Sequence, residues 1–285
     1  FVHKRIRGVH QCGRWRLFDR ATAYVCNLAV AVTSCITHVT HWFASSGCKV
    51  AIAAAGKAAT MPMKGPAMEN VTHTPKYEVV FFDLYGTLID IRTDEQCDAA
   101  WQALYDTACE LGAQYDSVEA VRERFEKLEA REMLHQSNHA IVRNGWDEFD
   151  VLPVYRSLLM NRNDEAERLL ALPQAAQKAA WAFRQGSTSM IRLYPGALEM
   201  IEKLQEAGIV VALLSNAQSC YTRAELEMTG LASVLDDVII SSEEKIRKPA
   251  RDLYMLALDR EFVTAKHALM VGNDEKNDIV GARSA

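Results

Sequence analysis

The sequence predicts an α/β protein: a doubly wound parallel sheet with an α-helical domain inserted into it. The strand-like runs are continuously apolar, as in residues 77–84 (YEVVFFDL) and 209–214 (IVVALL). Continuous rather than alternating hydrophobicity is typical of strands buried on both faces of a parallel sheet. These runs alternate with segments of helical spacing. That alternation predicts the doubly wound arrangement, in which ligands bind at the carboxyl ends of the strands.

Glycines mark the ends of the predicted helices. Gly208 ends one helix directly before the strand at 209–214, and Gly230 ends the next helix.

The expected elements are strands at 77–84, 209–214, 238–241 and 268–271, with helices at 198–207, 225–230 and 251–258. The four strands belong to one sheet, so their carboxyl ends are expected to meet along one edge.

A helical insert separates the first strand from the rest of this core. About 95 residues follow the first strand without a strand-like run, and they contain three charged segments with helical periodicity. These segments are 98–110, 118–135 and 165–184. The insert is expected over 95–190, closing near Tyr194-Pro195-Gly196. The core then consists of 68–94 and 191–285, and its second part is expected to be truncated at the C-terminus.

The first 67 residues differ in kind from the rest. They hold nine Lys and Arg against one acid, whereas the remainder holds 23 and 36. The favoured interpretation is a reading frame extended beyond the native start, with a targeting segment or a genuine domain as alternatives. Histidines and hydroxyl residues interrupt the apolar part at 21–55, so no stable membrane association is expected. If the leader is not a targeting segment, the protein is expected to be cytoplasmic.

The body after the leader is acidic and apolar enough for a globular core. The whole chain of 285 residues is 49% apolar and 24% charged, with a net charge of −5. Nucleic-acid binding needs basic surface, so the acidic body argues against it. Cys97, Cys109 and Cys220 show no metal-binding spacing, which favours idle thiols in a reducing compartment.

Four strand ends carry residues that are suited to chemistry. Asp83 is a carboxylate at a strand tip with a glycine three residues later, and Ser215 and Asn216 can donate hydrogen bonds to an anion. Lys248 offers a positive charge, and Asp274 and Asp278 offer oxygen ligands for a hard cation such as Mg²⁺. Each signal alone is common in loops. Their occurrence in order, each at the end of a predicted strand, indicates one site.

These segments resemble the four motifs of the haloacid dehalogenase (HAD) superfamily. The matching strings are FFDLYGTLID, LLSNAQ, RKP and VGNDEKNDIVGA, preceded in the second case by LYPGALEMIEKLQEAG. The resemblance spans about Tyr77 to Ala285. It implies a Rossmann-like core, and the insert resembles the helical cap of the subgroup that includes dehalogenases and many small-molecule phosphatases.

The resemblance also implies a role for each residue. Asp83 would be the nucleophile of a covalent aspartyl intermediate. Thr87 and Ser215 would hydrogen-bond the transferring group with Asn216 nearby, and Lys248 would neutralise charge on Asp83. The ligands of Mg²⁺ would be Asp83, the carbonyl of Tyr85, and Asp274 or Asp278.

Two positions depart from the phosphatase pattern. Tyr85 stands where phosphatases carry a second aspartate as general acid/base, and its phenol, with a pKa near 10, is poorly suited to that task. Tyrosine there resembles the 2-haloacid dehalogenases, which expel halide. Asn273 stands at the first acidic place of the fourth motif, yet Asp274 and Asp278 follow it. Because these two acids are present, the sequence favours a bound metal ion at this site.

The sequence therefore predicts a Mg²⁺-dependent phosphatase that acts on a small phosphate ester. The alternatives are a 2-haloacid dehalogenase that uses Asp83 without metal, and a catalytically weak protein that keeps the fold for binding or regulation. Asp90, Arg92 and Thr93 are expected at the hinge between core and insert. Residues 146–149 are expected to pack the insert helices.

Overall fold

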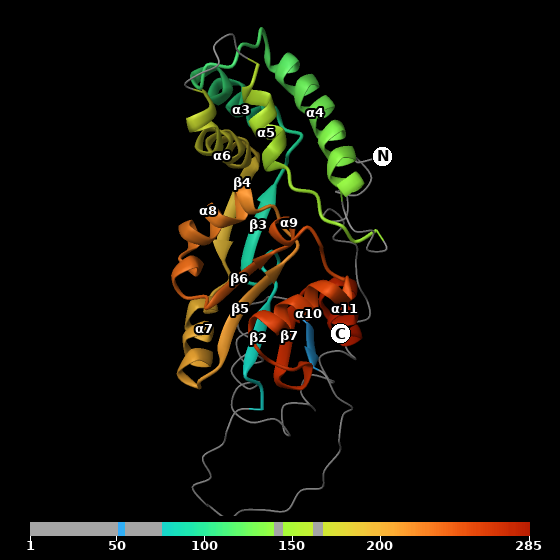
Figure 1. The fold of residues 1–285 in the computed structure, drawn as a ribbon. Helices are drawn as coiled ribbons and strands as arrows, with labels where there is room; N and C mark the ends of the chain where they lie inside the picture. The colour runs from blue at the N-terminus through green and yellow to red at the C-terminus, as the bar shows by residue number, and fades with distance from the viewer. Residues whose placement is uncertain (1–50, 55–75, 140–144, 162–167) are drawn as a thin grey trace, which may run out of the picture.

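A five-stranded sheet forms the centre of the protein in the computed structural model, which describes residues 51–54, 76–139, 145–161 and 168–285 (Figure 1). The strand order is β1-β7-β2-β5-β6. The strands are β1 (Ala51–Ala54), β2 (Val79–Phe82), β5 (Val210–Ser215), β6 (Asp237–Ile240) and β7 (Ala268–Gly272). β2 lies parallel to β5 and β7, and β6 lies parallel to β5. The predicted parallel α/β sheet is thus confirmed.

β1 adds an antiparallel edge strand that the sequence had not predicted. It runs along β7, with Ala51 opposite Gly272. Its four residues belong to the basic leader. The rest of the leader lies outside the described residues, so the interpretations of that segment stay predictions.

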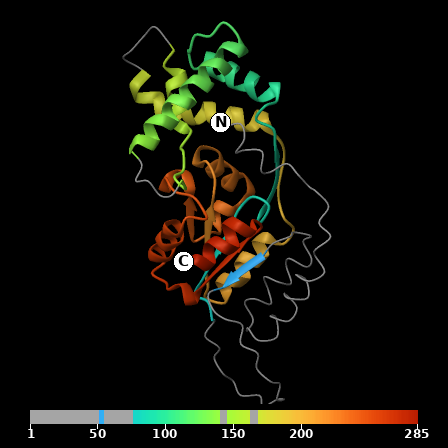
Figure 2. The ribbon, with the colours of Figure 1, turned by 90° about the vertical axis from the view of Figure 1, so that its right-hand side faces the viewer.

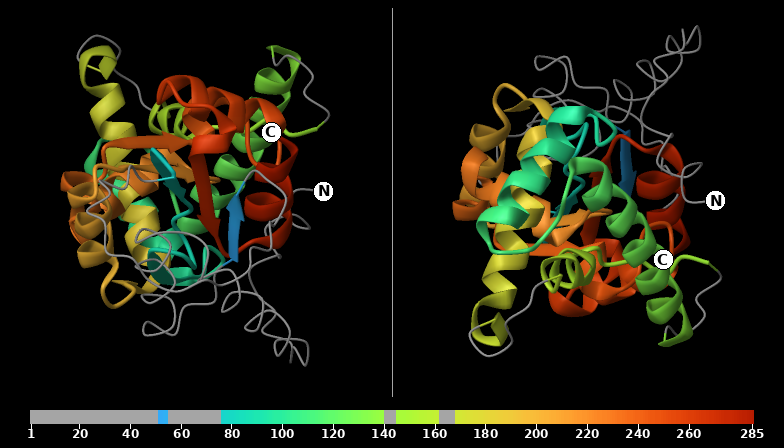
Figure 3. Two further views of the ribbon diagram at one scale, coloured as in Figure 1. Left: turned by 90° about the horizontal axis from the view of Figure 1, so that it is seen from below. Right: turned by 90° about the horizontal axis from the view of Figure 1, so that it is seen from above.

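Both faces of the sheet are covered by apolar side chains, as the continuous hydrophobic runs require. Val80 and Phe82 of β2 pack in the cluster that contains Ile201 of α7 (Ala197–Glu206). Val79 and Phe81 pack in the cluster that contains Leu253 of α10 (Arg251–Arg260). Successive residues of a strand point to opposite faces, so a strand between two helical layers needs apolar residues at every position. Figure 3 shows the sheet between these layers.

Further helices and turns complete the core at both ends of the strands. They are α8 (Ser219–Thr229), α9 (Ser241–Glu244), α11 (Gly281–Ser284), the 3-10 turns η3 (Leu231–Ser233) and η4 (Ala265–His267), and the π-helical turn η5 (Glu275–Val280). α8 ends at Gly230, whose φ of 79° is left-handed and favours glycine. The helix begins six residues earlier than the predicted start at 225.

The helical insert has a hydrophobic core of its own. Its helices are α3 (Asp98–Glu110), α4 (Val118–His139), α5 (Leu152–Leu159) and α6 (Arg168–Ser187). Trp101 meets Phe125 and Phe183 edge to face, with ring centroids 5.6 and 5.0 Å apart. The same cluster includes Tyr221 of α8, so the insert rests on the core through this helix (Figure 2). α5 was not predicted.

A two-stranded antiparallel ribbon connects the insert to the core, which corrects the expectation that no strand follows β2 before β5. β3 (Ile89–Thr93) pairs with β4 (Thr188–Leu193), and the ion pair between Arg192 and Asp90 measures 2.8 Å. The ribbon lies between the sheet and the insert helices in Figure 1. Asp90, Arg92 and Thr93 therefore lie where the hinge was expected.

No helix in the described parts of the chain is both long enough and apolar enough to cross a membrane.

Candidate active site

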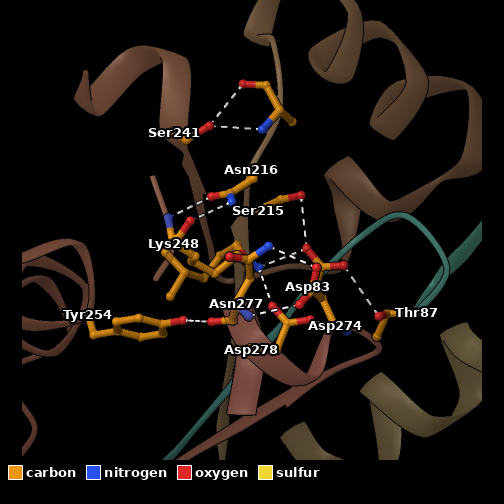
Figure 4. Close-up of polar contacts among 12 residues, drawn as sticks. Asp83, Thr87, Ser215, Asn216, Ser241, Lys248, Tyr254, Asp274, Asn277 and Asp278 are labelled. Atoms are coloured by element: carbon orange, nitrogen blue, oxygen red, sulfur yellow. Dashed lines mark hydrogen bonds and ion pairs between the residues drawn. The ribbon is translucent and has the colours of Figure 1, made fainter. Parts of the chain in front are cut away.

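The carboxylate of Asp83 is the meeting point of the four predicted motifs (Figure 4). Asp83 follows β2, and its main-chain nitrogen donates to Val271 of β7 over 2.8 Å. Its Oδ1 accepts hydrogen bonds from Ser215 Oγ at 3.2 Å and from Lys248 Nζ at 2.9 Å. Its Oδ2 accepts from Thr87 Oγ1 at 3.4 Å. Side chains from the first three motifs thus converge on one carboxylate, and Asp278 of the fourth motif joins them through Lys248.

Lys248 is a buried ammonium held by two carboxylates and one carbonyl. Its Nζ lies 2.6 Å from Asp278 Oδ1 and 2.7 Å from the main-chain oxygen of Leu214, in addition to Asp83. Burial alone would lower the pKa of Lys248, but the charges of Asp83 and Asp278 outweigh it and the pKa rises. The ammonium therefore stays charged at neutral pH and offsets the negative charge of Asp83.

Asp278 is the acid of the fourth motif that the structure brings to Asp83 and Lys248. It is 1% exposed, and its Oδ2 accepts a hydrogen bond from the main-chain nitrogen of Asp274 at 2.8 Å. Burial raises the pKa of Asp278 to about 6, against the lowering effect of Lys248. A Cβ on Gly272 would lie 2.2 Å from the Asp278 carboxylate, so the glycine leaves the space that this side chain occupies.

Asp274 lies on the exposed side of the same loop. Its carboxylate accepts hydrogen bonds from the main-chain and side-chain nitrogens of Asn277, both at 2.8 Å, and so caps η5. Of the two acids predicted as alternatives, Asp278 joins the buried cluster and Asp274 caps the turn at its rim. A metal contact of either acid stays a prediction.

Asn216 has a role that the sequence had not indicated. Its Nδ2 donates to the main-chain oxygen of Lys248 at 2.9 Å, and its Oδ1 accepts from the main-chain nitrogen of Lys248 at 2.8 Å. Both polar atoms of the amide are thereby engaged with one residue. The side chain positions Lys248, and any contact with substrate would fall to the main chain of Asn216.

Tyr85 directs its hydroxyl toward α8. The hydroxyl is bonded to Thr222 Oγ1 at 2.9 Å and to the carboxylate of Glu225. Burial, reinforced by Glu225, raises the pKa of Tyr85 far above its ordinary value. The phenol therefore stays protonated and is committed to α8, which leaves the main-chain carbonyl as the part of Tyr85 that can serve the site.

Two further residues behind Tyr85 were missed by sequence reasoning. Arg184 of α6 donates from Nε to Glu225 Oε1 at 2.6 Å, and its guanidinium lies 5.8 Å from the centre of the Tyr85 ring. Both members of this ion pair are largely buried, with side-chain exposures of 9% and 1%. In the sequence they are ordinary charged residues of helices, with no signal of their pairing.

Asn273, at the place of the usual acid, lies against the loop of the first motif. A Cβ on Gly86 would lie 2.2 Å from Asn273 Nδ2, and Gly86 itself has a left-handed φ of 78°. The open side of this glycine allows the amide to approach. Asn273 thus adds a further side-chain oxygen and nitrogen next to the Asp83 loop.

The donor atoms around Asp83 suit a hard cation in type. No group of three or more His, Cys, Asp or Glu side chains that could hold a metal ion occurs in the described part of the chain. The available ligands are the Asp83 carboxylate, the Tyr85 carbonyl, and the acids Asp274 and Asp278. Mg²⁺ prefers oxygen, keeps several waters, and is commonly bound by one or two carboxylates together with substrate phosphate. The oxygen donors of the site therefore suit a Mg²⁺ ion that is held by only a few protein ligands.

Comparison with known proteins shows the family to which this chain belongs. A family model described as haloacid dehalogenase-like hydrolase matches residues 77–285. Phosphoglycolate phosphatase of Vibrio parahaemolyticus is 30% identical over 210 residues, which cover 73% of this chain and 80% of that protein. (S)-2-haloacid dehalogenase 4A of Burkholderia cepacia is 28% identical over 195 residues, covering 68% and 73%. The chain belongs to the haloacid dehalogenase-like hydrolases.

Other similar proteins match a shorter part of the chain or have lower sequence identity. Ribulose-1,5-bisphosphate 5-phosphatase of Halopiger xanaduensis is 39% identical over 92 residues, which are 32% of this chain and 38% of that protein. Among solved structures, 2-haloacid dehalogenase of Pseudomonas syringae pv. Tomato is 20% identical, covers 73% of this chain and 83% of that one, and gives a TM-score of 0.46. The chain is thus similar to both phosphatases and dehalogenases within one hydrolase family.

Proposed function

We propose that this hydrolase is a Mg²⁺-dependent phosphatase that cleaves a small phosphate ester through an aspartyl-phosphate on Asp83. The observation that carries the proposal is the contact of Lys248 Nζ with both Asp83 (2.9 Å) and Asp278 (2.6 Å). This arrangement pairs a nucleophilic carboxylate with a fixed cation and a retained second acid. Phosphoryl transfer depends mainly on such positioning and charge stabilisation.

The side chains of the site account for the steps of the reaction. The Asp83 carboxylate attacks phosphorus, and the bond to the ester oxygen breaks. Lys248 would offset the charge, while the hydroxyls of Ser215 and Thr87, which donate to Asp83 in the structure, would donate to the phosphoryl oxygens during the reaction. The leaving oxygen takes its proton from water, since the Tyr85 phenol is committed to Glu225. A second water then attacks phosphorus and gives its proton to the hydroxide left by the first, so that the bond to Asp83 breaks, inorganic phosphate leaves and the carboxylate is regenerated. Bound Mg²⁺ would neutralise phosphoryl charge.

We further propose that the helical insert acts as a cap that selects the substrate and excludes water. Its support is the β3–β4 ribbon, which joins the insert to the first motif, and the packing of the insert on α8. A small molecule is the expected partner, with no nucleic acid. The cytoplasmic location stays a prediction.

A dehalogenase is the second candidate, and Tyr85 is the observation that favours it. Displacement of halide needs no protonation of the leaving group, so an engaged phenol would be no handicap. The two reactions differ in where water attacks: phosphorus in an acyl phosphate, but the carboxyl carbon of Asp83 in an ester with a 2-haloacid. Turnover in ¹⁸O-water, followed by mass spectrometry of the Asp83 peptide, would label Asp83 only in the dehalogenase.

The test of the proposal is phosphate release from a panel of small phosphate esters, with Mg²⁺ and with chelator. We expect release that requires Mg²⁺ and is abolished in Asp83→Asn. Release that survives the substitution would refute Asp83 as the nucleophile. If no ester and no 2-haloacid were turned over, the remaining alternative of a binding or regulatory protein with this fold would be favoured.

A further inference from the structure

A basic and aromatic cluster lies beside the loops that supply Lys248 and Asp278. Arg247 immediately precedes Lys248, and Lys276 lies two residues before Asp278. Both cations contact the same ring: the Arg247 guanidinium carbon lies 5.6 Å from the centroid of Trp146, and Lys276 Nζ lies 4.8 Å from it. The Trp146 cluster, as we call these three residues, thus joins two catalytic loops to the insert.

Trp146 is held to the core rather than to the insert helices, contrary to the expectation for residues 146–149. Its main-chain oxygen accepts from the nitrogen of Arg247 at 3.0 Å, and Asp147 forms an antiparallel bridge with Ile246. The ring packs against the hydrophobic cluster that contains Leu253. These contacts fix the ring beside the site, whereas Phe149 does pack in the core of the insert.

The two cations of this cluster form no ion pair with a carboxylate among the described residues. Ion pairs in the same loops belong to their neighbours: Lys245 with Asp150, and Lys248 with Asp278. Neither Arg247 nor Lys276 takes part in one, and Nε of Arg247 is buried without a hydrogen-bond partner in the described part of the chain.

Glu148 is an acid close enough for its charge to interact with that of Arg247, but its hydrogen bonds go to other groups. Glu148 accepts hydrogen bonds from Ser241 Oγ and from the nitrogen of Phe149, each at 3.0 Å. Holding two positive groups at one ring is unfavourable unless an anion offsets them, and a guanidinium is well suited to bind carboxylate or phosphate.

We propose that the Trp146 cluster binds a second acidic group of the substrate, a carboxylate or a second phosphate, carried by the part of the ester that leaves. This inference rests on the proposed phosphatase function and narrows its substrate class to phosphate esters with a further negative charge. The cations lie on the loops that follow β6 and β7, the strand ends at which Lys248 and Asp278 face Asp83. The proposal requires an ester whose second acidic group reaches from the nucleophile to the cluster.

The test compares matched esters in the presence of Mg²⁺. 2-Phosphoglycolate carries a carboxylate where 2-hydroxyethyl phosphate carries an alcohol. Propanediol bisphosphate and hydroxypropyl phosphate form the corresponding pair for a second phosphate. The variants are Arg247→Met and Lys276→Met, which keep the apolar stem against Trp146. Lys266→Met is the control, because Lys266 is also exposed but precedes β7 at the opposite end of the sheet.

We expect both variants to lower kcat/KM for at least one acid-bearing ester by about tenfold, as loss of a charge-assisted hydrogen bond predicts. The neutral partner esters and the Lys266→Met control should change by less than about twofold. The pair that responds identifies the second group as carboxylate or phosphate. Equal losses on charged and neutral esters, or no preference of the unaltered protein for a charged ester, would overturn the inference.

A binding experiment can test the Trp146 cluster even if the protein is not a phosphatase. If no ester is hydrolysed, calorimetric binding of 2-phosphoglycolate and of propanediol bisphosphate to the full chain still tests the cluster. Binding of either ligand that weakens about tenfold in Arg247→Met and Lys276→Met would support it. Unchanged affinity for both ligands, or absence of binding, would refute it. The exposed Lys276 provides the test even if Arg247→Met fails to fold.

Discussion

The hydroxyl of Tyr85 donates a hydrogen bond to the carboxylate of Glu225, 140 positions further along the chain on α8. Glu225 in turn is paired with Arg184 at the end of the insert. The residue that replaces the usual acid/base of a phosphatase is therefore part of a buried link between the first motif, α8 and α6. We therefore expect its side chain to hold these elements together and to take no part in proton transfer.

Tyr85→Phe should therefore affect stability more than catalysis. Loss of the hydroxyl removes hydrogen bonds to the buried Glu225 carboxylate and to Thr222, and should lower the free energy of unfolding by about 1.5–3 kcal/mol. Steady-state kinetics should show kcat within a few-fold of the unaltered protein. Tyr115→Phe is a matched control, since Tyr115 donates to the Leu158 carbonyl at 2.7 Å within the insert. Abolished turnover with unchanged stability would instead show that the phenol is a general acid/base.

The Arg184–Glu225 pair should show strong coupling in a double-mutant cycle. Arg184→Met or Glu225→Leu alone leaves a charge buried without its main partner, at a cost of about 3–5 kcal/mol. The double substitution removes both charges and should cost clearly less than the sum of the two. Urea unfolding of the four proteins measures this. Additive effects would mean that the pair contributes little to joining α6 and α8.

The local strand signals were sufficient to predict most of the core and the centre of the site. Buried strands such as β2 and β5 are continuously apolar, and the polar residues that end them, Asp83 and Ser215, face one edge of the sheet. The β3–β4 ribbon was not predictable in this way. Its strands are partly exposed, and they pair across the whole insert. Their structure depends on a partner about a hundred residues away.

Side-chain partnerships were the other part that the sequence did not reveal. Asn216 is a residue type that is common in ligand-binding loops, yet both polar atoms of its side-chain amide bind the main chain of Lys248. Arg184 and Glu225 look like exposed helical residues until the insert is packed on α8. Such roles arise from tertiary contacts, which local periodicity does not encode.

The stability of the protein should depend on pH through Asp278. Its pKa is about 6 in the folded state, against about 3.9 in an unfolded chain. The folded state therefore binds the proton more tightly, and the free energy of unfolding should fall as pH rises from about 4 to about 6. Asp278→Asn carries no titrating group and should flatten this part of the profile. Urea unfolding across that range measures both slopes, and identical slopes would contradict the assignment.

Gly272→Ala should damage the site while leaving the sheet intact. The added Cβ would meet the Asp278 carboxylate at 2.2 Å, so Asp278 must move away from Lys248. We expect kcat to fall about tenfold or more, because misplacement by about 1 Å is costly for catalysis. Gly208→Ala is the contrasting control: its φ of 78° makes alanine strained, but no atom lies within 4 Å. It should lower stability without a comparable loss of kcat, and equal kinetic losses in both variants would contradict the role of Gly272.

The proposed phosphatase reaction requires Asp83 to form a covalent aspartyl-phosphate. The direct measurement is borohydride trapping during turnover of a phosphate ester, followed by mass spectrometry, because reduction of an acyl phosphate converts the aspartate into homoserine. We expect homoserine at position 83 and at no other carboxylate, with none formed when substrate is omitted. Turnover that leaves Asp83 unmodified, or trapping at Asp274 or Asp278 instead, would contradict it.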